Sequence, residues 1–182
     1  LFPCLLVSTA EVASNAVDVA FLGLPHGAAQ DLCLGLPPSV RVIDLSPDFR
    51  FADPAVYTQW YGLTHKAPEL QKQAVYGLTE LARERLKDAR IIACPGCYPT
   101  SVQLPLVPLL EAGLIDPADI VIDAKSGVSG AGRAAKEGSL FAEVAEGVHA
   151  YGVAQHRHAP EIEQGLSAAA GQALRVNFTP HL

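Results

Sequence analysis

The chain has no methionine, one tryptophan and only four cysteines among its 182 residues. The cysteines show no regular spacing, so a disulfide framework is not expected; this favours a reducing compartment and predicts a cytoplasmic protein. Because the first residue is Leu1 and methionine is absent, we expect the chain to start inside a longer gene product. Residues 1–7 are apolar but few, and no basic segment precedes them, so we do not read them as a signal peptide.

Positive charge is also scarce. The chain has 13 Lys and Arg against 19 Asp and Glu, a net charge of −6, and no basic block. A protein that neutralises phosphates along a nucleic acid needs such a block, so we expect no nucleic-acid partner. No apolar run reaches the roughly 18 residues that span a bilayer, so we expect no membrane partner either. A hydrophobic fraction of 49% with 18% charged residues is typical of a globular protein.

The first half alternates short apolar strands with short helices. The pattern predicts strands over 17–22, 40–45 and 90–93 and a helix over 28–34. This order is typical of an open parallel α/β sheet, in which ligands bind beyond the carboxyl ends of the strands. His26 and the segment 46–50 follow the first two strands and therefore fall at those ends.

The remaining segments are less regular. Residues 53–79 are rich in proline, glycine and aromatics and read as a long structured loop, followed by a helix over 79–87 with Thr79 as its N-cap. Residues 99–112 read as a buried helix ended by Gly113, but with a kink or an early end near residue 104, because two prolines lie inside it. We further expect a strand over 119–123, a helix over 160–170 and a strand over 174–178, and a boundary near 96–100 that separates two domains, 1–96 and 97–182.

Cys97 is the strongest candidate for chemistry. It lies in the segment Cys94–Thr100, CPGCYPT, directly before the predicted buried helix. Free backbone N–H groups and the positive end of the helix dipole favour a thiolate there, and the thiolate is the nucleophilic form. The same N–H groups could stabilise an oxyanion if the thiolate attacked a carbonyl.

Two other interpretations of this cysteine remain open. Cys97 could be a buried structural cysteine, the usual state of this residue type. It could also form a redox pair with Cys94, since the two are spaced as CxxC. A zinc site would need a second such pair, and the sequence has none, so we expect no metal.

The segment His156-Arg157-His158 is the second candidate. Histidine is the side chain best suited to proton transfer near neutral pH, and a guanidinium between two imidazoles could hold an anion. The alternative is a polar surface turn before the 160–170 helix.

Two weaker candidates are a glycine loop and an arginine. The loop 126–132, SGVSGAG, could bring backbone N–H groups close to an anion or a flat ring, although it matches neither a P-loop nor a dinucleotide fingerprint. Arg50 follows the second strand and could bind a phosphate through two hydrogen bonds. Alternatively, the loop is a plain connection and Arg50 an ordinary ion-paired arginine.

Together, these segments resemble the N-acetyl-gamma-glutamyl-phosphate reductases of arginine biosynthesis, which are related to the aspartate-semialdehyde dehydrogenases. The resemblance covers nearly the whole chain in family order, through residues 21–27 (FLGLPHG), 42–50 (VIDLSPDFR), 74–78 (AVYGL), 95–100 (PGCYPT), 126–133 (SGVSGAGR), 150–151 (AY), 156–162 (HRHAPEI) and 178–182 (FTPHL). The segments around Cys97 and His156–His158 are specific, and the others corroborate them.

The resemblance implies a fold, a reaction and a cofactor. The fold would be α/β, with a partial Rossmann-like NADP-binding domain over 1–96 and an α+β catalytic and dimerisation domain over 97–182. The reaction would be the NADPH-dependent reduction of N-acetyl-γ-glutamyl phosphate to the semialdehyde and phosphate through a Cys97 thioester. The protein would be a homo-oligomer, a dimer or a tetramer.

The resemblance also implies roles for particular residues. His158, or alternatively His156, would be the acid/base. Arg50 would hold the substrate phosphate, with Arg157 as a further substrate-binding residue. Cofactor contacts would come from the glycine loop and from the end of the first strand, namely Ser126, Gly127, Gly130, Pro25 and His26.

The sequence departs from the family pattern in three ways. The glycine-rich strand–loop–helix that binds the NADP pyrophosphate is absent, and the C-terminal end of the family is not reached, so we expect a fragment. Cys94 and Pro105 stand where the family usually has asparagine and a helix-forming residue. The alternatives are a lysine-pathway reductase acting on carrier-linked aminoadipyl phosphate, an aspartate-semialdehyde dehydrogenase, or an inactive fragment that serves as a binding module.

Overall fold

The computed structural model describes residues 8, 11 and 17–182. Residues 1–7, which we did not interpret as a signal peptide, lie outside the described residues. The chain separates into two compact units, Leu1–Gly96 and Cys97–Leu182. Among the described residues, no helix is both long and apolar enough to cross a membrane.

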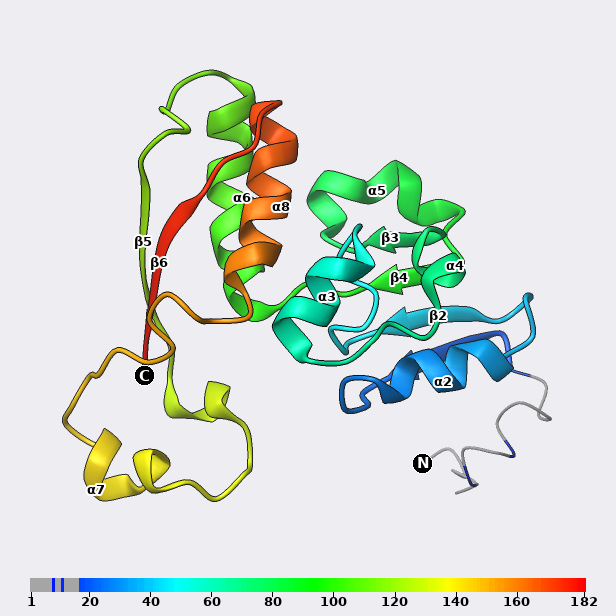
Figure 1. Cartoon of the computed structure of the whole chain (residues 1–182), viewed down its shortest axis with the longest axis horizontal. Helices are drawn as coiled ribbons and strands as arrows, with labels where there is room; N and C mark the ends of the chain where they lie inside the picture. Colours follow the sequence, from blue (N-terminus) through cyan, green and yellow to red (C-terminus); the bar gives the residue numbers. More distant parts are fainter. Residues whose placement is uncertain (1–7, 9–10, 12–16) are drawn as a thin grey trace, which may run out of the picture. The chain divides into compact units, whose positions relative to one another are not determined.

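The first unit is built on a four-stranded parallel sheet (Figure 1). Its strands are β1 (Val19–Leu22), β2 (Arg41–Asp44), β3 (Ala74–Tyr76) and β4 (Ile91–Ala93), in the spatial order β1-β2-β4-β3. The three strands predicted here from apolar runs are present within one or two residues of their expected bounds. Parallel pairing aligns the carboxyl ends of the strands along one edge, which places the segments after β1, β2 and β4 on the same side of the sheet.

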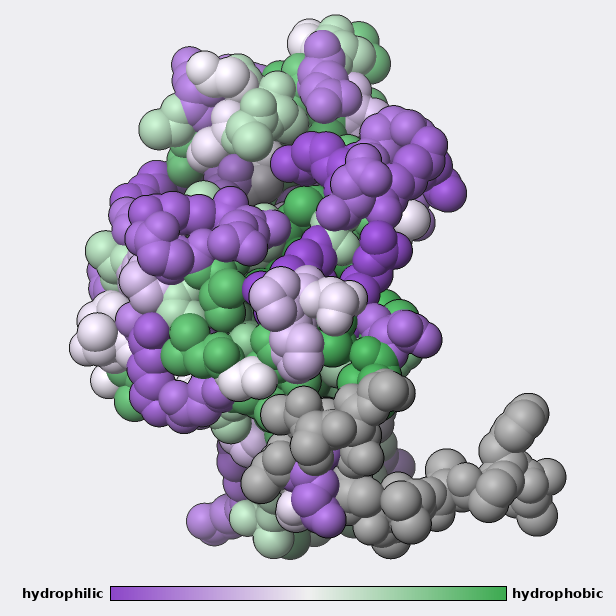
Figure 2. All heavy atoms as spheres, turned by 90° about the vertical axis from the view of Figure 1, so that its right-hand side faces the viewer, coloured by the Kyte–Doolittle hydropathy of each residue, from purple (hydrophilic) through white to green (hydrophobic). Residues whose placement is uncertain are grey.

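Helix α2 (Ala28–Gly35) buries Ala29 and Cys33 against β2 and β4, where Val42 and Ile91 are fully enclosed. Burial raises the pKa of the Cys33 thiol to about 12, so this cysteine is a packed apolar side chain. Beyond this core, hydrophilic and hydrophobic side chains are interleaved over the face seen in Figure 2.

The prediction of a loop over 53–79 was wrong. The segment holds the helices α3 (Pro54–Tyr61) and α4 (Pro68–Gln71) as well as the strand β3. Both helices carry proline in their first turn, where its missing N–H is not needed, and the Asp53 side chain caps α3 by accepting from the Ala55 N–H at 2.8 Å. We had read these prolines as turn signals rather than helix starts.

The start of helix α5 (Thr79–Lys87) differs in one detail from the prediction. Leu78 occupies the N-cap position and Thr79 is already helical, so the expected threonine cap is absent. The helix buries Ala82 and presents charged residues along the rest of its length.

The second unit places two helices against a two-stranded parallel sheet (Figure 1). The helices α6 (Cys97–Glu111) and α8 (Ala159–Ala170) lie side by side, and the strands β5 (Ile120–Lys125) and β6 (Val176–His181) pair in parallel register. Their core contains Ile162 and Leu166, both fully buried, together with Val102 and Ile122.

Helix α6 does not end near residue 104, as we had predicted. It continues through Pro105 and Pro108 to Glu111. Gly113 follows two residues later with a left-handed φ of 64°, which fits its expected role as the stop of the helix. Proline costs a helix about 3 kcal/mol by removing a hydrogen bond and crowding the preceding turn. Burial of Val102, Val107 and Leu110 against the core outweighs that cost.

The segment that connects β5 to α8 begins with the glycine loop named from the sequence, but its short helical turns were not predicted. It contains two short 3₁₀ turns, η1 (Val128–Ala131) and η2 (Glu137–Ser139), and the one-turn helix α7 (Phe141–Val144). In Figure 1 this segment extends from the ends of β5 and β6, away from α6 and α8.

Candidate active site

Cys97 is the first residue of α6, and its thiol is exposed. Pro99 occupies the third position of the helix, where a missing N–H breaks no intrahelical bond. The N–H groups of this first turn have no helical acceptor and point towards the end of the helix that carries Cys97. The helix start therefore offers the exposed sulfur and the backbone donors that the sequence predicted.

The two histidines lie at the same end of the second unit, next to the start of α6. The ring of Tyr98, the residue after Cys97, meets the His156 and His158 rings edge-on at centroid distances of 5.6 and 5.8 Å. The two imidazoles also contact each other at 4.8 Å. The nucleophile candidate and both acid/base candidates are thus brought together through Tyr98.

The tautomer of His156 follows from one hydrogen bond. Its Nδ1 accepts from the backbone N–H of His158 at 3.1 Å, so the neutral ring carries its proton on Nε2. Burial lowers the pKa of His156, and the positive charge of Arg157 lowers it further. The neutral imidazole is therefore the dominant form near pH 7. Arg157 itself is exposed between the two histidines.

A pair of tyrosine hydroxyls completes this cluster, and sequence reasoning gave neither of them a role. The Tyr151 hydroxyl donates to the Tyr98 hydroxyl at 3.1 Å, and the Tyr98 hydroxyl donates to the His181 carbonyl at 3.4 Å. Burial raises the pKa of Tyr151, helped by the bond to Tyr98 and by the negative charge of a nearby Cys97 thiolate. The phenol next to Cys97 is therefore a neutral hydrogen-bonding group.

The glycine loop begins where β5 ends. The Ser126 N–H donates to the His181 carbonyl at 2.9 Å, and the Ser126 hydroxyl donates to the Gly127 carbonyl at 3.0 Å. A Cβ on Gly130 would meet the Ser126 hydroxyl, so the two residues pack closely within this turn. The exposed backbone of this turn is open to a flat ring or an anion.

The candidates Pro25 and His26 lie at the carboxyl end of β1, directly before α2. The His26 ring packs against Tyr61 at 5.6 Å. The amide donors at the start of α2 are occupied: the Asp48 carboxylate accepts from the Gly27 N–H at 2.7 Å and from the Gln30 N–H at 3.3 Å. A ligand at this edge would therefore meet the Pro25 and His26 side chains rather than free helix amides.

Asp48 was not among our candidates, yet it organises this edge of the sheet. It is fully buried and also accepts a hydrogen bond from the Tyr57 hydroxyl at 2.9 Å. The sequence carried a signal, because an acidic residue directly after a buried strand is unusual unless its charge is satisfied.

Arg50 joins the ends of two strands. Its Nε donates to the Cys94 carbonyl at 2.8 Å and its Nη2 donates to the Leu45 carbonyl at 2.9 Å. The side chain is largely buried. These bonds hold the segments after β2 and β4 together.

Cys94, half-buried, is fixed by its backbone. Its N–H donates to the Asp44 carbonyl at 2.8 Å. Burial raises the pKa of the Cys94 thiol, and the Asp44 carboxylate raises it further. Cys33, Cys94 and Cys97 all carry free thiols, and within residues 17–182 no group of His, Cys, Asp and Glu side chains is arranged to hold a metal ion.

The candidate residues fall into two sets. Pro25, His26 and Arg50 belong to the first unit, whereas the cysteine, both histidines, Arg157 and the glycine loop belong to the second. Comparison with known proteins divides the chain in the same way. Residues 5–89 match the family model described as semialdehyde dehydrogenase, NAD binding domain, and residues 97–182 match the one described as semialdehyde dehydrogenase, dimerisation domain.

The chain belongs to the semialdehyde dehydrogenase family. The parallel sheets and the two matched domains confirm the α/β fold expected from the sequence. A nicotinamide cofactor is the coenzyme that the first of these family domains binds.

Several relatives of this chain share one activity in their names. The chain is 61% identical to "N-acetyl-gamma-glutamyl-phosphate reductase" of Rhodospirillum rubrum over 97% of its length and 52% of the relative's. It is 58% and 56% identical to the "Probable N-acetyl-gamma-glutamyl-phosphate reductase, chloroplastic" of Arabidopsis thaliana and Oryza sativa, covering 44% and 43% of those proteins. The chain thus spans about half the length of the curated relatives it matches.

Proposed function

We propose that the chain carries catalytic and ligand-binding residues of an N-acetyl-gamma-glutamyl-phosphate reductase. In this reaction NADPH reduces N-acetyl-γ-glutamyl phosphate to N-acetyl-glutamate semialdehyde with release of phosphate, a step of arginine biosynthesis. The observation that carries the proposal is the exposed Cys97 thiol at the start of α6, beside the histidine and tyrosine cluster. The names of relatives at 56–61% identity support the choice of substrate.

Cys97 is the nucleophile in this proposal. Its sulfur attacks the γ-carbonyl carbon, a C–S bond forms, the C–O bond to phosphate breaks and phosphate leaves, giving a thioester. The N–H groups of the first turn of α6 stabilise the oxyanion that forms during attack. A bound reduced nicotinamide would supply a hydride to the thioester carbon; the thiohemiacetal on Cys97 would then lose its C–S bond and release the aldehyde.

A histidine is proposed to assist at the oxygen atom of the thiohemiacetal. With its proton on Nε2 and a lowered pKa, His156 is neutral near pH 7 and can donate a hydrogen bond to the thiohemiacetal oxygen. His158, our preferred acid/base from the sequence, contacts the same Tyr98 ring and remains the alternative. The Tyr98 and Tyr151 hydroxyls hold this cluster in place.

The substrate's negative groups need cations. Arg50 is proposed to hold the phosphate, because a guanidinium matches the geometry of a phosphate group. Arg157, exposed between the histidines, is proposed as a second substrate contact.

The cofactor is proposed to be NADP(H), with the nicotinamide half on Ser126, Gly127 and Gly130. The exposure of Gly127 and Gly130 directly after β5 supports this assignment. Pro25 and His26 would line the same cofactor from the end of β1. A homo-oligomer in the cytoplasm completes the proposal, although the two plant relatives carry "chloroplastic" in their names.

The proposal is tested in the oxidative direction with N-acetyl-glutamate semialdehyde, phosphate and NADP⁺, following the absorbance of NADPH. Cys97→Ser should lower kcat/KM by about 10³-fold or more, because the hydroxyl is a far weaker nucleophile. The matched control is Cys94→Asn. Its kcat/KM should stay within about tenfold of the wild-type value, because the sulfur of Cys97 remains in place. Phosphate-dependent turnover that survives in Cys97→Ser, or no turnover in the wild type, would overturn the proposal.

A further inference from the structure

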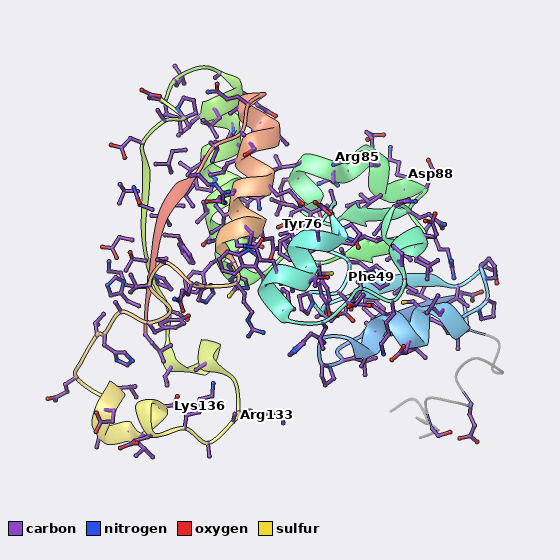
Figure 3. All side chains as sticks on the ribbon, viewed as in Figure 1. Phe49, Tyr76, Arg85, Asp88, Arg133 and Lys136 are labelled. Carbon is purple, nitrogen blue, oxygen red and sulfur yellow. The ribbon has the colours of Figure 1, made fainter. Side chains whose placement is uncertain are left out.

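The ring of His156 packs among three aromatic rings that come from different parts of the second unit. It meets Tyr98 of α6, Tyr151 of the loop before α8 and Phe178 of β6 edge-on, at centroid distances of 5.6, 5.4 and 5.3 Å. Earlier in the same connection between β5 and α8, Arg133 is exposed and extends outward (Figure 3). The last part of this connection is therefore packed, whereas its earlier part faces solvent.

The turn that leads to His156 is bent by left-handed backbone. Gly152 and Ala154 have φ values of 55° and 58°, and the Gln155 N–H donates to the Gly152 carbonyl at 3.0 Å. A left-handed conformation costs a residue with a side chain roughly 1–2 kcal/mol, so Ala154 keeps it only where the surroundings hold the turn. A Cβ on Gly152 would lie 3.4 Å from the imidazole Cδ2, so the ring rests on this turn. The orientation of the imidazole therefore depends on what fixes the turn.

Tyr151 fixes the start of the turn twice. Its backbone N–H donates to the Pro180 carbonyl of β6 at 3.0 Å, and its hydroxyl donates to the Tyr98 hydroxyl at 3.1 Å. Tyr98 is buried in the first turn of α6 and donates to the His181 carbonyl at 3.4 Å. The two hydroxyls therefore tie the turn to α6 and to the end of β6.

The surroundings of the imidazole favour its neutral form. The titratable or charged groups that face it are the phenols of Tyr98 and Tyr151, the His158 ring at 4.8 Å and the guanidinium of Arg157. Burial is the larger cause of the lowered pKa of His156, and Arg157 is the smaller one. Water that reached the ring would remove the larger cause. The pKa of His156 therefore reports how firmly this cluster is closed.

We propose that Tyr151 and Tyr98 are positioning residues for His156 and act through the hydrogen bond between their hydroxyls. This bond holds the turn closed and keeps the imidazole in the orientation in which Nδ1 accepts from the His158 N–H and Nε2 carries the proton. The inference rests on the proposed function, because the Nε2 proton serves the oxygen of the acyl group on Cys97. A donor that is already fixed needs no reordering when the thiohemiacetal forms, so the bond contributes to kcat rather than to substrate binding.

The protonation of His156 tests the proposal without any need for turnover. The chain is labelled with ¹³C at the histidine Cε1 atoms and titrated by NMR, and the His156 signal is assigned by its loss in His156→Asn. In Tyr151→Phe, which keeps the ring and removes the hydroxyl, the pKa of His156 should rise towards the ordinary value of about 6.5, because the loosened turn admits water. Tyr98→Phe should raise it in the same way. The matched control Tyr57→Phe removes a hydroxyl that binds Asp48 in the first unit, and it should leave this pKa unchanged.

Turnover in the oxidative assay gives the second readout, with circular dichroism to verify folding. Tyr151→Phe and Tyr98→Phe should each lower kcat about tenfold and leave KM within about twofold of the wild-type value. The double variant should lose no more than either single variant, because both substitutions break the same bond.

An unchanged pKa of His156 in Tyr151→Phe, an unchanged kcat in that variant, or losses of kcat that multiply in the double variant would each overturn the proposal. A wild-type chain without turnover would overturn the proposed function instead, and the pKa of His156 would then decide alone whether the hydroxyl pair holds the imidazole.

Discussion

At the scale of single residues, His156 links the candidate site to pH. Burial and Arg157 lower its folded pKa, so between that value and about 6.5 the unfolded chain binds a proton that the folded chain does not. The free energy of unfolding should therefore fall as pH drops below about 6.5. His156→Asn should remove part of this loss, as measured by urea unfolding at pH 7.5 and 5.5. Equal pH dependence in the wild type and the variant would contradict the proposed protonation state.

Asp44 should act in the opposite direction. It is fully buried, and burial raises its pKa from 3.8 to about 6, although two hydrogen bonds from Ser46 oppose the shift. Its stabilising contribution is complete below 3.8 and is lost as pH rises through about 6, an effect of up to about 3 kcal/mol. Asp44→Asn should therefore be more favourable relative to wild type at pH 7.5 than at pH 5, as measured by the difference in unfolding free energy. A difference that is the same at both values would contradict the raised pKa.

The sequence led to Cys97, His156 and His158 because each stands in a short motif whose spacing suits its chemistry. It could not lead to Tyr98 and Tyr151, since the hydroxyl pair forms only when residues 53 positions apart meet in the fold. Asp48 was missed for a similar reason, because the donors that satisfy its carboxylate lie on α2 and α3.

At the scale of elements, two aspartates cap helices in different surroundings. Asp48 is buried and serves the Gly27 and Gln30 N–H groups and the Tyr57 hydroxyl, whereas Asp53 caps α3 at the surface. Asp48→Ala should lower the free energy of unfolding by about 3 kcal/mol or more, because it leaves buried donors unpaired. Asp53→Ala should cost about 1 kcal/mol. Urea unfolding measures both, and equal losses would contradict the central role of Asp48.

The contact between α6 and α8 depends on a glycine. A Cβ on Gly165 would collide with the side chain of Gln103, which is buried and donates to the Glu161 carbonyl at 3.4 Å. Gly165→Ala should therefore destabilise the fold by about 1–3 kcal/mol, despite the higher helix propensity of alanine. In a Gln103→Ala background the same change should be neutral or stabilising, as a double-mutant cycle in urea would show. If Gly165→Ala still lowers the free energy of unfolding in the Gln103→Ala variant, the steric clash does not involve Gln103.

Element boundaries were predictable where the apolar pattern was clear, as for α2, α8 and the strands β1, β2 and β4. Prolines misled in both directions. Pro54 and Pro68 start helices that we read as loop, and Pro105 lies within a helix that we expected to end. Local propensity alone could not show these outcomes, because burial of the surrounding apolar residues decides them.

At the scale of the whole molecule, the composition favours certain classes of binding partner, and the two matched domains show the family to which the chain belongs. From the negative charge and the lack of a basic block we predict small molecules and other protein chains, rather than nucleic acids, as partners. The 3₁₀ turns and the single helical turn between β5 and α8 could not be foreseen from the sequence, because they carry no periodic pattern.

The central claim is that Cys97 accepts the acyl group, and covalent trapping tests it most directly. The chain is mixed with N-acetyl-γ-glutamyl phosphate in the absence of any nicotinamide nucleotide, quenched in acid and digested, and its peptides are weighed by mass spectrometry. Without hydride the thioester cannot be reduced, so the acyl group should accumulate on the peptide that contains Cys97 and be released by hydroxylamine. Acylation of a different side chain, or an unmodified Cys97 under conditions where phosphate is released, would contradict the account.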